Sequence, residues 1–185
     1  NLFCWKRQPI PEITKYVNTL FTKQFEYIAF RTNTEILAND LNIYRKRWDP
    51  DHQRSADVFW KDVYRITNDF LYLSKDKEGI VFLRIIEDNA CTKFHTDGYH
   101  LRLFTTYYGR GTEWLPENAV NRKGLGKTND VIVRDPSKIK QMDTFEVGIL
   151  KGEQLGAKTT VKGIVHRSPA ISLESEKRLI LRVDL

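Results

Sequence analysis

The chain has 185 residues, which is long enough to form one hydrophobic core without disulfide or metal support. Its 41% hydrophobic residues, with four Trp, eight Tyr and ten Phe, exclude a disordered chain. The 30 basic and 24 acidic residues are interspersed, so the net charge of +6 favours a solvated surface over a nucleic-acid-binding one. We therefore expect a single domain over residues 1–185.

Two cysteines, Cys4 and Cys91, are too few for a disulfide scaffold and lack a CxxC pattern. This usage indicates reduced thiols in a cytoplasmic protein, and Cys91 is expected to be a small buried residue at a strand edge. No stretch approaches the roughly 18 consecutive apolar residues of a membrane helix, and the start lacks a signal-peptide pattern. The sequence predicts no membrane association.

Residues 1–78 have mainly helical character. Two stretches carry apolar residues at spacings of three and four, namely Ile13, Val17, Leu20 and Phe21, and then Val58, Phe59, Val63, Ile66, Phe70 and Leu73. Pro11 favours a helix start before the first stretch, and Ser55 is expected to cap the helix over 55–74. Between these helices, residues 27–31 are predicted to form a strand and residues 36–44 a short helix.

Residues 79–185 change to a β pattern, beginning with the short apolar run at 80–86. Further strands are predicted at 101–108, 112–115, 131–134, 145–150, 159–166 and 179–184. Strands that follow one another without intervening helices favour an antiparallel sandwich, barrel or jelly roll over a parallel sheet. The polar segment at about 117–141 is expected to be a long loop with one short strand, acting either as a lid or as a disordered linker. The predicted class is mainly β (α+β), with N-terminal helices buttressing one face.

A candidate metal site comes from His95, Asp97 and His166. In extended backbone, residues two apart lie on the same face, so His95 and Asp97 converge. His166 ends a predicted strand far along the chain. Two His and one carboxylate form the facial triad of non-haem iron(II) oxygenases, which leaves positions open for oxygen and a bidentate co-substrate. Zinc or nickel are alternative metals, because affinity order alone does not favour iron.

The last predicted strand carries two arginines on one face, Arg178 and Arg182, while its apolar residues lie on the other face. If the Arg-bearing face is turned inward it needs an anionic guest, and a guanidinium matches a carboxylate. The alternative is a solvent-facing edge strand. On an earlier strand, Arg102 and Tyr108 are further candidates for binding substrate or co-substrate, with a surface arginine and a core tyrosine as the alternative.

The order of these features resembles the iron(II) and 2-oxoglutarate dependent dioxygenase superfamily over about residues 80–185. The features are the HxD pair, a long insert, a distal His and Arg on the final strand. The resemblance implies a double-stranded β-helix (jelly roll), with His95, Asp97 and His166 as iron ligands. It implies Arg178 as first candidate and Arg182 as second candidate for the anchor of the 2-oxoglutarate distal carboxylate.

The chain as a whole is also similar to an uncharacterised, mainly bacterial domain family of unknown function. The segments that carry this similarity are 91–97, 101–107, 111–116, 150–153 and 166–169. Because that family name conveys no activity, the expected function comes from the superfamily. It is hydroxylation or oxidative demethylation of a small-molecule or unknown substrate. The alternatives are a non-redox metal-binding jelly roll, acting as sensor, store or scaffold, and a nucleic-acid-binding module.

Overall fold

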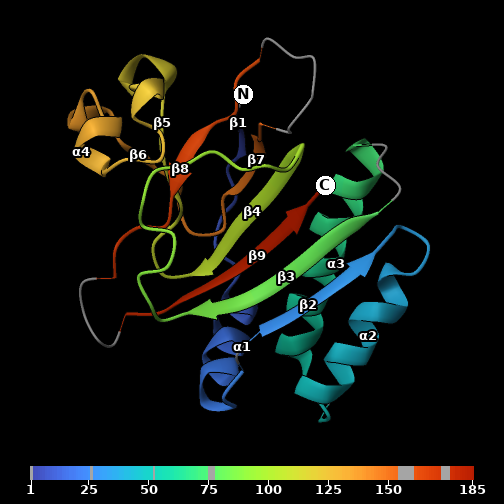
Figure 1. Cartoon of the computed structure of the whole chain (residues 1–185). Coiled ribbons are helices and arrows are strands. Elements are labelled where there is room, and N and C mark those ends of the chain that lie inside the picture. The colour runs from blue at the N-terminus through green and yellow to red at the C-terminus, as the bar shows by residue number, and fades with distance from the viewer. Residues whose placement is uncertain (1, 26, 52, 75–77, 154–160, 172–175) are drawn as a thin grey trace.

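The computed structural model describes residues 2–25, 27–51, 53–74, 78–153, 161–171 and 176–185 (Figure 1). The helices are α1 (Pro11–Thr22), α2 (Leu37–Trp48), α3 (Arg54–Ser74) and the short α4 (Asn129–Ile132). Three 3-10 turns flank α4 in the chain, at Glu117–Ala119, Arg122–Gly124 and Pro136–Lys138. None of the helices in these ranges has the combined length and apolar character that crossing a membrane requires.

The strands form two antiparallel sheets. The larger sheet has the order β1-β7-β4-β9-β3-β2, and the smaller one has the order β6-β5-β8. The larger sheet contains β1 (Leu2–Trp5), β2 (Tyr27–Thr32), β3 (Gly79–Ile86), β4 (Leu101–Tyr108), β7 (Val147–Lys151) and β9 (Arg178–Asp184). The smaller sheet contains β5 (Glu113–Leu115), β6 (Lys140–Gln141) and β8 (Val165–Arg167). The mainly β, antiparallel class predicted from the sequence is therefore confirmed.

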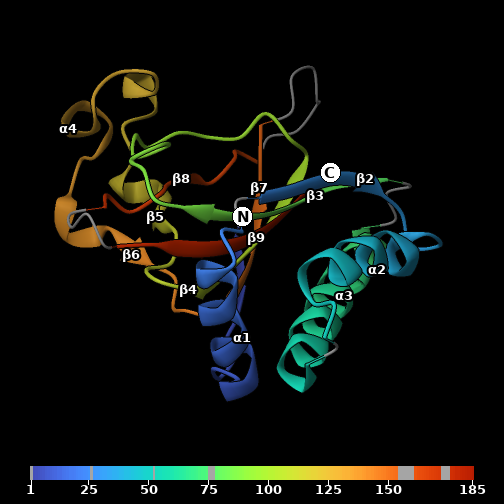
Figure 2. The same ribbon diagram turned by 90° about the horizontal axis from the view of Figure 1, so that it is seen from below.

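Helices cover one face of the larger sheet, as Figure 2 shows. The apolar stripes of α1 and α3 meet the inward residues of β3, β4 and β9 in one buried cluster, which includes Val17, Phe59, Val63, Leu83, Leu103 and Leu181. Each large apolar side chain buried in this way contributes about 1.5–3 kcal/mol. The helices thus pack against one face of the larger sheet, and the opposite face lines a cavity.

The residues of β9 alternate between these two faces. Leu179, Leu181 and Val183 are fully buried against the helices, while Arg178 and Arg182 line the cavity. The strand lies between β4 and β3, so it is not a sheet edge. The alternative of a solvent-facing edge strand is therefore wrong, and the arginine-bearing face is turned inward.

The N-terminal part contributes to the sheet as well as to the helical layer. Strand β1 pairs with β7, and β2 pairs with β3, so both ends of the larger sheet come from residues 1–78. Strand β1 was not predicted, because a four-residue strand with exposed side chains has no distinctive pattern. Helix α3 begins at Arg54, so Ser55 lies in its first turn and the predicted cap is wrong.

The segment 117–141 packs as part of the molecule around a second apolar cluster. Ala119, Val120 and Ile132 from this segment contact Phe94 and Val165 there. The predicted strand at 131–134 is wrong: α4 covers its first half, and Val133 only forms an isolated bridge with Val120. The apolar residues at 131–133, which suggested a strand, instead include the buried residue of a helical turn, Ile132. The disordered-linker interpretation is excluded by this packing.

Candidate metal centre

A pair of backbone hydrogen bonds brings the HxD segment beside the distal histidine. The His95 amide donates to the His166 carbonyl oxygen at 3.0 Å, and the His166 amide donates to the His95 carbonyl oxygen at 2.9 Å. This isolated bridge adds the HxD segment to the free side of β8, whose other side pairs with β5. The two imidazole ring centroids are consequently 4.6 Å apart.

The potential ligand atoms of His95, Asp97 and His166 all lie within 4.8 Å of one another. His95 Nε2 is 3.8 Å from Asp97 Oδ1, and His166 Nε2 is 3.3 Å from Asp97 Oδ2. Metal–nitrogen and metal–oxygen bonds are each about 2 Å long, so three donors at these separations surround a space of the size of one ion. The structure thus brings together all three residues that the sequence singled out as ligands.

Hydrogen bonds from the other ring nitrogens orient the two imidazoles. His95 Nδ1 lies 2.8 Å from the Lys93 carbonyl oxygen, and His166 Nδ1 lies 3.3 Å from the Ile164 carbonyl oxygen. A carbonyl oxygen only accepts, so each Nδ1 is the donor, and in the neutral form of such a ring the Nε2 lone pair is left free on the side of Asp97. Burial of the His166 ring lowers its pKa to about 4, against the opposing effect of the nearby Asp97 carboxylate. The ring is therefore neutral near pH 7, as a metal ligand must be.

A buried arginine holds the Asp97 carboxylate. Arg102 Nη1 donates to Asp97 Oδ1, while its Nε and Nη2 donate to the two carboxylate oxygens of Asp184, the latter at 3.0 Å. The second oxygen, Asp97 Oδ2, is buried and has no hydrogen-bond partner within the described ranges. A buried carboxylate oxygen without a partner costs free energy, and a cation at the triad removes this cost. The donor set therefore fits a divalent metal.

A cavity of about 1000 Å³ lies in front of the triad, and its lining includes His95, His166, Arg102, Phe104, Arg178 and Arg182. Arg178 is only 2% exposed, and its Nε donates to the Arg110 carbonyl oxygen at 2.6 Å. Its Nη1 is buried without a hydrogen-bond partner in the described structure, and burial lowers its pKa to about 10. A guanidinium that is charged at neutral pH and retains an unused donor is suited to bind an anion in the cavity.

Arg182 has a different environment from Arg178. Its guanidinium stacks 3.9 Å from the ring centroid of Phe82, and its Nε lies 3.2 Å from Asp184 Oδ2. Arg182 thus joins the Asp184–Arg102–Asp97 chain of charges beside the triad. The two arginines are four residues apart on β9, which corresponds to about 13 Å along the strand, so they serve different parts of the cavity.

Tyr108 is not one of the residues that line the cavity, although it packs against one that does, Phe21. The register between β4 and β9 shifts between Thr106 and Tyr108, so that Tyr108 pairs with Leu179. Its ring packs edge-on against Phe21 of α1, with centroids 4.8 Å apart. Alternation of side chains along the strand predicted that Tyr108 lies on the same face as Arg102. An irregularity in strand pairing breaks this alternation and cannot be predicted from it.

Several features of the site were not evident from the sequence. Phe104 places its ring 5.7 Å from that of His166, and Arg102 holds the Asp97 carboxylate where it was expected to bind substrate or co-substrate. Cys91 is exposed, has a φ of 60° and borders the cavity, so the expectation of a buried residue is wrong. The segment 150–153 carries part of the family similarity, but its sequence does not indicate that Glu153 lies beside Asp97, where its amide donates to the Asp97 carbonyl oxygen.

The fold is a jelly roll, as predicted, and it is similar to the fold of a solved dioxygenase. A crystal structure of the rice dioxygenase for auxin oxidation has a TM-score of 0.58 and 14% identity, covering 100% of this chain and 72% of that chain. The Arabidopsis thaliana dioxygenase for auxin oxidation 1, solved with 2-oxoglutarate, gives a TM-score of 0.45 and 12% identity, covering 97% and 65%. A prolyl-4-hydroxylase of Pseudomonas putida gives 0.38 and 11%, covering 98% of each chain.

The chain belongs to the family described as Protein of unknown function (DUF1826), which matches residues 1–184. No curated protein matches the chain. The likeness to the rice enzyme, at 14% identity, shows the shared fold, while the chemistry has to be argued from the residues of this site.

Proposed function

We propose that this protein is a non-haem iron(II), 2-oxoglutarate-dependent dioxygenase. The observation that carries the proposal is the convergence of His95, Asp97 and His166, with the unpartnered Asp97 Oδ2 among them, at the wall of a large cavity. Two imidazoles and one carboxylate leave other coordination positions free, which is the requirement for binding both a co-substrate and oxygen.

Each residue has a distinct task in this proposal. His95, Asp97 and His166 hold the metal, and Arg102 keeps Asp97 oriented through its hydrogen bond to Oδ1. Arg178 binds the distal carboxylate of 2-oxoglutarate with the donor that the protein leaves unused. Arg182 remains the second candidate for this anchor; its Nε lies 3.2 Å from Asp184 Oδ2 but forms no hydrogen bond within the described residues.

Iron(II) with 2-oxoglutarate, when bound, supplies the oxidation of an unactivated C–H bond by dioxygen. The protein contributes binding, orientation and exclusion of water. The cavity volume of about 1000 Å³ accommodates a small-molecule substrate beside the co-substrate. Its wall combines the rings of Phe82 and Phe104 with the two arginines, so an organic substrate of mixed polarity is expected to be hydroxylated or oxidatively demethylated.

The proposal is tested by adding iron(II) and 2-oxoglutarate to the protein without oxygen. A visible charge-transfer band is expected with the native chain and is expected to be absent with Asp97→Ala. Admission of oxygen together with a reductant such as ascorbate should then convert 2-oxoglutarate to succinate and carbon dioxide, with the second oxygen atom reduced to water. Tight zinc(II) or nickel(II) binding without the band and without succinate would refute the oxygenase and favour a non-redox metal-binding jelly roll, because the same donors hold those metals.

A further inference from the structure

Glu153 connects the two chain segments that carry the candidate ligands. Its amide donates to the Asp97 carbonyl oxygen at 2.7 Å, and its Oε2 accepts from the Thr96 hydroxyl at 3.2 Å. Its Oε1 accepts from the Gly163 amide at 3.2 Å, three residues before His166. A single side chain therefore holds the HxD segment on one side and the chain that leads into β8 on the other.

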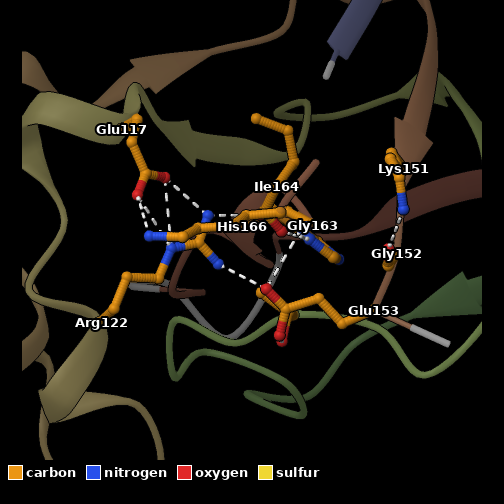
Figure 3. Close-up of polar contacts among 10 residues, drawn as sticks. Glu117, Arg122, Lys151, Gly152, Glu153, Gly163, Ile164 and His166 are labelled. Carbon is orange, nitrogen blue, oxygen red and sulfur yellow. Dashed lines mark hydrogen bonds and ion pairs between the residues drawn. The ribbon is translucent and has the colours of Figure 1, made fainter. Parts of the chain in front are cut away.

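Arg122, from the turn Arg122–Gly124, completes this connection, as Figure 3 shows. Its Nη1 donates to Glu153 Oε1 at 2.7 Å, and its Nη2 donates to the Gly163 carbonyl oxygen at 2.7 Å. The same guanidinium donates to the Glu117 carboxylate, with a shortest distance of 2.6 Å. Three acceptors from three segments thus converge on one planar group, which is the geometry that arginine provides and lysine lacks.

The backbone before Glu153 passes unusually close to the HxD segment. A Cβ at Gly152 would lie 2.0 Å from the Tyr99 carbonyl oxygen and 2.8 Å from the Asp97 carbonyl oxygen. Only glycine permits this approach, and the approach is what lets the Glu153 amide reach Asp97. The position of Glu153 beside Asp97 is therefore fixed by the close approach of the backbone at Gly152.

We propose that Glu153 and Arg122 are positioning residues, which fix the separation between the HxD segment and the His166 strand and so preorganise the metal site. The inference rests on the proposed metal site. It also gives the segment 117–141 a role: this segment supplies the arginine that holds the two ligand segments together. Neither residue is among the three donors that surround the proposed ion.

A surface ion pair without function is the competing interpretation. The Glu153 and Arg122 side chains are 40% and 19% exposed, and ion pairs of this exposure stabilise a fold only slightly. Preorganisation predicts a larger effect on metal binding, since removal of a group that orients metal ligands typically lowers metal affinity by about 10- to 100-fold. The two interpretations therefore separate when metal affinity and fold stability are measured on the same variants.

The experiment measures cobalt(II) affinity and the visible spectrum of bound cobalt, together with urea unfolding of the metal-free protein. The variants are Glu153→Ala, Glu153→Gln and Arg122→Met. Glu78→Ala is the matched control, since Glu78 forms an exposed ion pair with Arg31 on the larger sheet. Cobalt alone is the probe, so no activity is needed.

We expect Glu153→Ala and Arg122→Met to weaken cobalt binding by about 10- to 100-fold and to alter its spectrum. We expect Glu78→Ala to change neither. Glu153→Gln should lie between, because its one amide oxygen can still accept from the Gly163 amide, whereas an NH2 group replaces the oxygen that accepts from Thr96 and the charge that pairs with Arg122 is lost. Unfolding should remain cooperative, with small changes in free energy.

The positioning role would be overturned if Glu153→Gln and Arg122→Met bound cobalt with an affinity within about twofold of that of the native chain and with the same visible spectrum. This comparison holds even if Glu153→Ala fails to fold. A loss of affinity that merely tracks the loss of fold stability would overturn it too. If the native chain itself binds no cobalt, the metal site and the proposed function fail first. Binding by the native chain with unaffected variants refutes this inference alone.

Discussion

Burial of His166 gives the metal-free fold a specific dependence on pH. The folded protein lowers the pKa of this imidazole from 6.5 to about 4, mainly because the ring is removed from water. In the unfolded chain the ring returns to its ordinary pKa near 6.5. Between these two values the unfolded chain binds more protons at this position than the folded chain does. The free energy of unfolding therefore falls as the pH is lowered through this window.

The size of the effect follows from the displacement of the pKa. One pKa unit corresponds to about 1.4 kcal/mol, so a change from 6.5 to about 4 costs roughly 3 kcal/mol once the pH is below both values. Above about pH 6.5 both states hold a neutral ring, and this cost disappears. Since the free energy of unfolding of a domain is typically about 5–15 kcal/mol, the effect is a measurable fraction of total stability.

The assay is urea unfolding of the native chain and His166→Gln, with a chelator present, at about pH 7 and about pH 4.5. The native chain is expected to lose about 2–3 kcal/mol more than His166→Gln between these conditions, because only the native chain must keep a buried imidazole neutral. His100→Gln, which alters an exposed histidine, should behave like the native chain. Equal losses in the native chain and His166→Gln would refute the reasoning.

Further predictions concern the triad, the arginines and the crossing at Gly152. Asp97→Ala should retain the far-UV circular dichroism of the native chain but weaken zinc(II) binding by more than about 100-fold, and unchanged binding would exclude the site. Arg178→Met should keep metal affinity and weaken 2-oxoglutarate binding about 10- to 100-fold by calorimetry, whereas the same effect in Arg182→Met alone would transfer the anchor role. Arg102→Met removes the only arginine among the described residues that is paired with the buried Asp97 carboxylate and one of the two beside Asp184, so urea unfolding should show a loss of about 3–5 kcal/mol, and a loss below about 1 kcal/mol would contradict the pairing. Gly152→Ala places a Cβ 2.0 Å from a backbone oxygen, so loss of cobalt affinity or of folded protein is expected, and native behaviour in both would show that the chain path there is adaptable.

Local patterning was sufficient to determine much of the secondary structure. The spacing of apolar residues predicted α1 and α3, because a helix repeats every 3.6 residues and needs one apolar stripe to bury. The alternation on the last strand predicted which face of β9 is apolar, because successive strand side chains point in opposite directions. Patterning was misleading at residues 131–134, where a short apolar run fits a buried helical turn as well as a strand.

For the candidate site, too, local sequence patterns predicted some features, while others depend on the tertiary structure. The sequence by itself predicted that His95 and Asp97, two residues apart, point to one side and that Arg178 and Arg182 share a face of the last strand, since both predictions depend on local backbone geometry. Only the tertiary structure decided that His166 joins the pair, because this depends on a backbone bridge between remote segments. It likewise decided the partners of Arg102, Glu153 and Arg122, because a charged side chain is compatible with many environments until folding brings particular donors and acceptors together.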